Sequence, residues 1–341
     1  MGLYLRHPSS FEHDTGAHPE SARRLTAIEA ALSERDWLGL DLVEAPAAER
    51  EQLLRVHEAA HVDAIERLSA RGGGAIDLDT VASVGSWQAA LHSAGGAAHA
   101  VDRLIGDGAD GALRFAFCGL RPPGHHAKRA RAMGFCLFNN AGVAATQALS
   151  EHGAERVLVL DWDVHHGNGT EAIFYESAEV LYVSIHQSPL YPGTGAVSDI
   201  GRGAGEGYTV NLPVPPGTGT REYLSLVQHL VLPLGREWRP QLLIISAGYD
   251  AHREDPLAQC ELDDAAYWQM AAMVRELGGQ LEVPVLVCLE GGYALEPLAR
   301  SVVATLESLG GDAEPPEADP EPAAGYRDRF SRHWPALAGR S

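Results

Sequence analysis

The sequence predicts a single-domain α/β fold built on a largely parallel β-sheet, and two observations support this prediction. From Phe115 onward, short apolar runs alternate with stretches of helical periodicity, which is the pattern of buried parallel strands joined by crossover helices. The composition is globular, with 45% hydrophobic residues, 37 glycines and 20 prolines in 341 residues. The chain can therefore bury a sizeable core.

The chain before this region is expected to be mainly helical. Apolar residues recur at helical spacing across residues 20–68, with charged residues between them, and this periodicity predicts helices. The glycine run at 72–74 and the segment 76–79 predict a loop. Another helix is expected over residues 86–105.

Five apolar runs predict the strands, namely Phe115–Cys118, Val157–Leu160, Val180–Ile185, Leu242–Ser246 and Val285–Leu289. Helical periodicity between them, at 141–149, 223–232 and 265–277, supplies the crossovers that parallel strands require. The acidic, proline-rich stretch 312–322 resembles a linker. We therefore expect one domain over residues 1–311, followed by the linker and a C-terminal tail, 312–341, that packs on or near the domain.

The charge balance excludes several classes of partner. The formal net charge of −20 repels phosphate backbones and anionic lipid headgroups and attracts cations. Neither nucleic acid nor a membrane is therefore expected as a partner. The sequence shows no leader peptide and no apolar run of about 18 residues, so we expect a cytoplasmic protein.

The cysteines predict neither a disulfide framework nor a thiolate zinc site. They are widely spaced and form no CxxC pair. Both features argue against a disulfide framework and against a thiolate zinc site. We expect small buried hydrophobic residues at Cys118, Cys136, Cys260 and Cys288.

Chemically distinctive segments follow four of the five predicted strands. They are Arg-Pro-Pro-Gly-His-His (121–126), Asp-Trp-Asp-Val-His-His-Gly-Asn (161–168), Ala-Gly-Tyr-Asp (247–250) and Glu-Gly-Gly-Tyr (290–293). In open α/β sheets, ligands bind in the crevice at the carboxyl ends of the strands. The sequence therefore predicts one crevice lined by carboxylates, imidazoles and a phenol.

Asp163, His165 and Asp250 are the expected ligands of a catalytic metal ion. Asp163 and His165 alternate along a segment that leaves a strand, so their side chains start on the same face, and Asp250 can close the set. Nitrogen and oxygen donors without a thiolate suit a Zn²⁺ that keeps one position open. Fe²⁺ or Co²⁺ would also fit these donors.

Each of these residues also has a purely structural interpretation. An isolated pair such as His125-His126 is more often part of a surface or core than a base. Tyr293 would serve as an aromatic residue packed on a turn, and Asp250 as the N-cap of a following helix. We favour the functional interpretation because four strand ends carry such residues together.

These segments resemble the histone deacetylase and acetylpolyamine amidohydrolase superfamily. The resemblance also includes His-Pro-Glu (18–20), Val-His and His-Val-Asp-Ala-Ile within 56–65, Gly-Phe-Cys (134–136) and Tyr-Pro-Gly-Thr-Gly (191–195), and it extends from about residue 11 to 308. The Pro-Pro before the histidine pair and Asn168 are similar to class II rather than class I members. The resemblance implies the arginase/deacetylase-like fold, a single domain with a mostly parallel eight-stranded sheet flanked by helices.

The resemblance implies the catalytic roles. His125 and His126 would form a dyad beside the metal, and Tyr293 would face them across the site. Asp161 would orient His125. Asn168 stands where class I enzymes place a carboxylate, which should leave His126 less basic.

The resemblance also implies the substrate-binding residues. Gly134, Phe135 and Tyr191 would line a tunnel for acetyl-lysine, and Asp79 would grip the substrate backbone at the rim. Leu257 would lie at the tunnel mouth. Polyamine-selective relatives carry glutamate there, whereas lysine deacetylases carry leucine, so Leu257 favours acetyl-lysine.

A structural K⁺ or Na⁺ is a further implication of the resemblance. Its ligands would be the side chains of Asp161 and Ser184 and main-chain carbonyls of Asp163, His165 and Ile185. A second cation site would use main-chain oxygens near Phe174, Ser177, Val180 and Tyr208.

We therefore predict a metal-dependent amidohydrolase, with one Zn²⁺ per chain, that deacetylates acetyl-lysine in proteins or peptides. Acetylpolyamines and small acetylated amines are the alternative substrates, and a homo-oligomer is left open. An arginase-like enzyme with two metal ions is disfavoured because Gly167 and His252 stand where bridging carboxylates would be expected. An inactive acetyl-amine binding module is disfavoured because every ligand, the dyad and the phenol are present.

Overall fold

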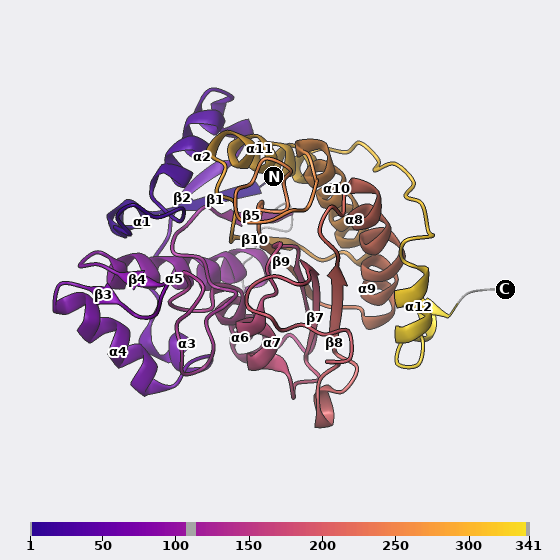
Figure 1. Ribbon diagram of the computed structural model, residues 1–341, viewed down its shortest axis with the longest axis horizontal. Coiled ribbons are helices and arrows are strands. Elements are labelled where there is room, and N and C mark those ends of the chain that lie inside the picture. Colours follow the sequence, from indigo (N-terminus) through magenta and orange to yellow (C-terminus); the bar gives the residue numbers. More distant parts are fainter. Residues whose placement is uncertain (1, 107–113, 339–341) are drawn as a thin grey trace.

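The structure, a computed structural model, describes residues 2–106 and 114–338 (Figure 1). Its centre is an eight-stranded sheet in the order β2-β1-β5-β10-β9-β6-β7-β8. Every neighbouring pair is parallel, so the predicted α/β fold is confirmed and the sheet is parallel throughout. The strands are β1 Gly2–Arg6, β2 Asp41–Glu44, β5 Phe115–Cys118, β6 Val157–Asp161, β7 Val180–Gln187, β8 Thr209–Val214, β9 Leu242–Ala247 and β10 Val285–Leu289.

Helices cover both faces of the sheet (Figure 1). Helices α2, α8, α9, α10 and α11 contribute to one hydrophobic cluster, and α3 to α7 contribute to the other. Within the described residues, no helix combines the length and apolar character needed to cross a bilayer. The helices are α1 Ser9–Glu12, α2 Arg23–Ser33, α3 Arg50–Leu54, α4 Ala59–Ala70, α5 Ser86–Ile105, α6 Asn140–Glu151, α7 Asn168–Phe174, α8 Thr220–Leu226, α9 Leu232–Trp238, α10 Asp264–Leu281, α11 Leu295–Gly310 and α12 Ala324–Phe330.

The central strands are buried on both faces. In β6, Leu158 and Leu160 join one cluster, while Val157 and Val159 join the other. Because both faces are covered, β6 is apolar at successive positions instead of alternating with polar residues. This burial explains why the central strands are predictable from short apolar runs.

Three strands of the eight-stranded sheet were not revealed by an apolar run, namely β1, β2 and β8. The prediction of helix throughout residues 20–68 is wrong at β2. This strand lies at the edge of the sheet and is largely exposed, so it has no apolar run to detect. The segment predicted as a loop at 72–79 contains β3 (Gly74–Ala75), which pairs with β4 (Val81–Ala82) in a small antiparallel sheet.

The chain beyond residue 311 packs against the same core. The indole N–H of Trp334 donates to the carbonyl of Gly207 at 2.8 Å, and the buried residues of this segment join the cluster with α8 to α11, namely Ala318, Ala323, Phe330, Trp334 and Leu337. Residues 339–341 of the predicted tail lie outside the described residues. The division of the chain at residue 311 stays a prediction.

Candidate active site

The four strands that carry the distinctive segments are neighbours in the sheet. Strands β5, β10, β9 and β6 are consecutive, although they come from distant parts of the sequence. Because all four are parallel, the segments that follow them meet at one edge of the sheet. The site is built from these segments.

Asp163, His165 and Asp250 place three donor atoms within 4.8 Å of one another. The Nδ1 atom of His165 lies 3.2 Å from a carboxylate oxygen of Asp163 and 3.0 Å from one of Asp250. The N-cap interpretation of Asp250 is wrong. Its carboxylate accepts the backbone N–H of Val164 at 3.0 Å, and the next helix has its own N-cap, Asp263.

Two glycines make room for these carboxylates. A Cβ at Gly291 would lie 2.1 Å from an oxygen of Asp250 and 2.6 Å from one of Asp163, and a Cβ at Gly248 would lie 2.1 Å from the same Asp163 oxygen. The Gly291 N–H donates to this oxygen at 2.8 Å. Only glycine allows the backbone to approach the acids so closely.

The donor set fits a divalent cation. Asp163 and Asp250 are fully buried and share the imidazole of His165, and a second imidazole, that of His125, lies 3.9 Å from Asp163. Two buried carboxylates so close together are costly without a cation to balance them. Burial and the charge of Asp163 raise the pKa of Asp250. Burial also acts to raise the pKa of Asp163, but the charges of His125 and His165 outweigh it and hold that pKa below its usual range. Oxygen and nitrogen donors of this kind suit Zn²⁺, Fe²⁺ or Co²⁺.

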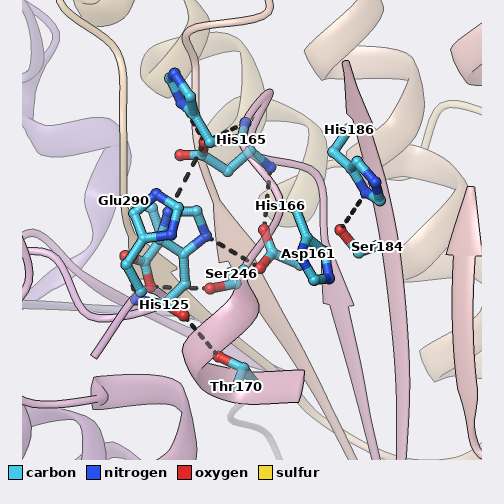
Figure 2. Close-up of polar contacts among 12 residues, drawn as sticks. His125, Asp161, His165, His166, Thr170, Ser184, His186, Ser246 and Glu290 are labelled. Atoms are coloured by element: carbon cyan, nitrogen blue, oxygen red, sulfur yellow. Dashed lines mark hydrogen bonds and ion pairs between the residues drawn. The ribbon is translucent and has the colours of Figure 1, made fainter. Parts of the chain in front are cut away.

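His125 and His126 lie side by side next to these donors, with ring centroids 4.0 Å apart. Nδ1 of His125 lies 3.1 Å from a carboxylate oxygen of Asp161 (Figure 2). Nδ1 of His126 lies 2.8 Å from the amide oxygen of Asn168. Because an amide oxygen only accepts hydrogen bonds, the proton of neutral His126 resides on Nδ1, and its Nε2 is left as a base.

The two histidines differ in basicity. At His125, burial acts to lower the pKa, but the charges of Asp163 and Asp161 outweigh it and raise the pKa to about 10. At His126, burial and the neighbouring charges of His125 and His165 lower the pKa well below its ordinary value. The neutral Asn168 brings no charge to offset this effect.

Tyr293 is held by three contacts. Its backbone N–H donates to a carboxylate oxygen of Asp255 at 2.7 Å. Its ring stands edge-on to Phe135, with centroids 5.8 Å apart, and the Arg24 guanidinium lies 5.1 Å from the ring centroid. Burial and the charge of Asp250 raise the pKa of Tyr293 well above its ordinary value, so the phenol keeps its proton and can donate a hydrogen bond.

Phe135 and Tyr191 flank the histidines and the phenol. The Tyr191 ring is edge-on to His126, with centroids 5.1 Å apart. Gly134 has a φ of +56°, and a Cβ there would lie 2.3 Å from the His126 ring. The structure therefore brings three predicted tunnel residues, Gly134, Phe135 and Tyr191, around the reactive groups.

Asp79 and Leu257 lie on loops farther out. The Asp79 carboxylate accepts the Thr80 hydroxyl at 3.1 Å. Burial is the main cause that raises the pKa of Tyr191, and the charge of Asp79 is the second. Asp79 therefore lies close to that phenol. The Leu257 N–H donates to Asp255 at 3.0 Å, which ties its loop to the same carboxylate that holds Tyr293.

Asp161 and Ser184, the predicted side-chain ligands of a monovalent cation, are paired across β6 and β7. Both are fully buried. Asp161 accepts the Tyr182 hydroxyl at 3.0 Å. The Ser184 hydroxyl lies 2.9 Å from Nδ1 of His186 (Figure 2). The predicted carbonyl ligand Ile185 follows Ser184 in β7.

The positions considered for a second divalent metal offer no carboxylate. A Cβ at Gly167 would lie 2.0 Å from an Asp161 oxygen, which excludes a larger residue there. His252 pairs instead with Asp264, with 3.2 Å between nitrogen and oxygen. These contacts favour a single metal ion. The four cysteines are buried and free, as predicted.

Sequence reasoning assigns no role to Glu290, yet its carboxylate is fully buried in the site (Figure 2). One oxygen accepts the N–H groups of Gly124 at 2.7 Å and His125 at 3.1 Å, and the other accepts the Ser246 hydroxyl at 2.8 Å. Glu290 thus ties together the ends of β5, β9 and β10. An acid directly after the apolar run 285–289 is the signal that could have identified it.

A second group without a predicted role lies against Tyr293. Arg24 and Arg121 share the carboxylate of Glu20, at 3.3 Å and 2.7 Å, and all three side chains are fully buried. Arg24 also donates to the carbonyl oxygens of Gly292, at 2.6 Å, and Glu290. The His-Pro-Glu segment, which contains Glu20, is the signal that could have identified this network.

Comparisons with known proteins agree with this geometry. The family model described as Histone deacetylase domain matches residues 18–309. The chain is 40% identical over 319 residues to the histone deacetylase-like amidohydrolase of Pseudomonas aeruginosa, covering 91% of this chain and 80% of that protein. It is 40% identical over 334 residues to a probable deacetylase of Methanothermobacter thermautotrophicus, covering 97% and 96%.

A solved structure supports the same assignment. The crystal structure of the HDA15 HD domain matches with a TM-score of 0.90 at 37% identity, covering 98% of each chain. The chain therefore belongs to the histone deacetylase family and is an amidohydrolase.

Proposed function

We propose that this amidohydrolase is a zinc-dependent deacetylase that hydrolyses the acetyl amide of acetyl-lysine in proteins or peptides. The convergence of Asp163, His165 and Asp250 beside two histidines and a phenol carries the proposal. One Zn²⁺ per chain is the proposed cofactor, with Fe²⁺ or Co²⁺ suited to the same donors. When bound, the ion would supply Lewis acidity to the acetyl carbonyl and to the attacking water.

The protein's own groups divide the proton transfers. His126 is the base that takes a proton from water and later returns one to the departing amine, because its Nε2 is free. His125, held by Asp161, contributes positive charge next to it. The Tyr293 hydroxyl donates to the acetyl oxygen as negative charge develops there.

The rim residues favour a lysine substrate. Phe135 and Tyr191 form the proposed walls of the tunnel, and Asp79 is the proposed contact to the substrate backbone. Leu257 at the mouth is the residue that lysine deacetylases of the family carry. Acetylpolyamines and small acetylated amines are the competing substrates, because the acetyl amide is the same and a net charge of −20 attracts cations.

A structural K⁺ or Na⁺ is proposed next to the metal site. Its side-chain ligands would be Asp161 and Ser184, with main-chain carbonyls of Asp163, His165 and Ile185 completing the shell. The buried pairing of Asp161 with Ser184 across β6 and β7 supports this proposal. The cytoplasmic location and the exclusion of nucleic-acid partners stay predictions from the sequence.

Metal analysis and parallel substrate assays test the proposal. The purified protein should contain one zinc per chain and should deacetylate an acetyl-lysine peptide with a higher kcat/KM than acetylspermidine. A reversed preference would transfer the assignment to the alternative substrate. A zinc-loaded protein that binds these compounds without turning them over would contradict the enzymatic proposal.

A further inference from the structure

A second pocket lies beside the candidate active site. Its volume is about 500 Å³, and it is formed by one side of α4 and by the segments 76–77 and 130–132. We call it the side pocket. Its lining is partly apolar, with Ile65, Leu68 and Ile76, and partly cationic, with Arg67, Arg71 and Arg131.

The side pocket is positively charged, because Arg67, Arg71 and Arg131 line it with a single acid, Asp77. The Asp77 carboxylate is turned into its own loop, where one oxygen accepts the N–H of Thr80 at 2.8 Å. Its other oxygen lies 3.9 Å from Arg131, which is too long for a hydrogen bond. Asp77 therefore neutralises the pocket incompletely.

The remaining arginines are also weakly paired. Arg67 lies 3.9 Å from an oxygen of Asp63, whose other oxygen is engaged by Arg50 at 2.5 Å. In the part of the chain that the structure describes, no acidic group forms an ion pair with Arg71. This arrangement contrasts with a chain of 46 acidic and 26 basic residues. The charge of the side pocket is therefore local.

The side pocket and the tunnel share their walls. The N–H of Ile76 donates to the Thr80 carbonyl at 2.8 Å, and the Thr80 hydroxyl accepts the N–H of Phe135 at 3.1 Å. The pKa of Tyr191 is raised, first by burial and then by the charge of Asp79, and the charges of Asp77 and Arg131 also act on this phenol. The side pocket therefore adjoins the rim of the proposed tunnel.

We propose that the side pocket binds an acidic side chain of the peptide substrate close to the acetyl-lysine, an inference that rests on the proposed function. Guanidinium groups form paired, charge-assisted hydrogen bonds with carboxylates. The apolar wall of Ile65, Leu68 and Ile76 receives the methylene groups of a glutamate. An acetylpolyamine, being cationic, gains nothing from this pocket.

The test uses acetyl-lysine peptides that differ at one position. Glutamate or glutamine is placed at each of three positions on either side of the acetyl-lysine. For one of these positions, the kcat/KM of the glutamate peptide should exceed that of the matching glutamine peptide by about threefold to tenfold, because one partly exposed charge-assisted contact is worth about that much. Added salt should weaken this preference. Equal rates for every matched pair would overturn the proposal.

Variants assign the preference to the side pocket. The double variant Arg71→Ala with Arg131→Ala should bring the ratio of glutamate to glutamine peptide close to one. Arg202→Ala removes an exposed positive charge elsewhere, where Arg202 pairs with Glu176, and should leave the ratio unchanged. A double variant that keeps the preference contradicts the assignment.

Binding separates this inference from the proposed function. If no peptide is deacetylated, the proposed function fails. The affinity of the same peptides, labelled and measured by fluorescence anisotropy, still tests the side pocket. Tighter binding of a glutamate peptide by the parent, lost in the double variant, supports the side pocket. Equal binding of matched peptides by the parent overturns it.

Discussion

The floor and the rim of the candidate site are held in different ways. The floor, which we define as Asp161, Asp163, Asp250 and Glu290, is fully buried. The rim, which we define as Asp79, Phe135, Tyr191 and Leu257, lies on loops. There, Tyr191 is 37% exposed and Leu257 is half-buried.

The difference shows where chemistry and selectivity reside. The floor residues lie at the ends of adjacent strands, and the register of the sheet fixes which residues neighbour them. For example, Asp161 pairs with Ser246 on one side and with Ser184 on the other. Removing one partner of such a buried group costs about 3–5 kcal/mol, whereas an exposed contact is worth about 0–1 kcal/mol. We expect floor substitutions to abolish reaction or folding, and rim substitutions to change the choice of substrate.

The largest effect is expected for Asp250→Asn. A neutral amide is a poor metal ligand, so zinc and activity should be lost together, with kcat/KM at background. Zinc analysis and the peptide assay measure both. Asp319→Asn, at an exposed acid that pairs with Arg221, should retain both. An active Asp250→Asn protein with one zinc per chain would break the assignment of this residue to the metal.

The next largest effect is expected for Glu20→Gln, which leaves Arg24 and Arg121 without their shared carboxylate. Losing a buried partner should lower the free energy of unfolding by about 3–5 kcal/mol at pH 7, measured by urea denaturation. Glu34→Gln, at the exposed end of α2, is the matched control. An equally small loss for both variants would refute the role of the network.

The same variant has a defined pH dependence. Burial acts to raise the pKa of Glu20, but Arg121, with His13 and Arg24, outweighs it and lowers the pKa from 4.5 to about 2. The contribution of Glu20 is therefore complete above pH 4.5 and is lost as the pH falls to about 2. The stability difference between parent and variant should shrink across this window, and a constant difference would contradict the assignment.

Tyr293→Phe should have a smaller effect that is confined to catalysis. Removing one donor to a developing oxyanion lowers kcat by about 10²–10³. Zinc content and the melting temperature should stay unchanged, because the backbone contact to Asp255 and the ring contacts to Phe135 and Arg24 remain. An unchanged kcat would remove the Tyr293 hydroxyl from the mechanism.

The smallest effect is expected at the rim, for Leu257→Glu. A carboxylate at the mouth should attract the internal ammonium of acetylspermidine and raise its kcat/KM relative to an acetyl-lysine peptide by about tenfold, or about 1.4 kcal/mol. Leu257→Gln is the neutral control. If the ratio does not change, Leu257 does not select the substrate, and the floor chemistry is unaffected.

The sequence by itself determined the local parts of the site. Apolar runs revealed the central strands because both of their faces are buried. The alternation of Asp163 and His165 indicated a shared face, and the residues that follow β9 and β10 pointed to the same edge. Each of these features depends on residues close together in the chain, so spacing was enough.

Only the tertiary structure decided how distant segments meet. The order β5-β10-β9-β6 makes the four motif-bearing strands adjacent, and no local pattern encodes strand order. The contacts of Glu290 with Gly124 and Ser246, and of Arg24 with Gly292, join segments far apart in the chain. The edge strand β2 was missed because exposure removed its apolar pattern. Long-range packing therefore supplied what local periodicity and spacing do not contain.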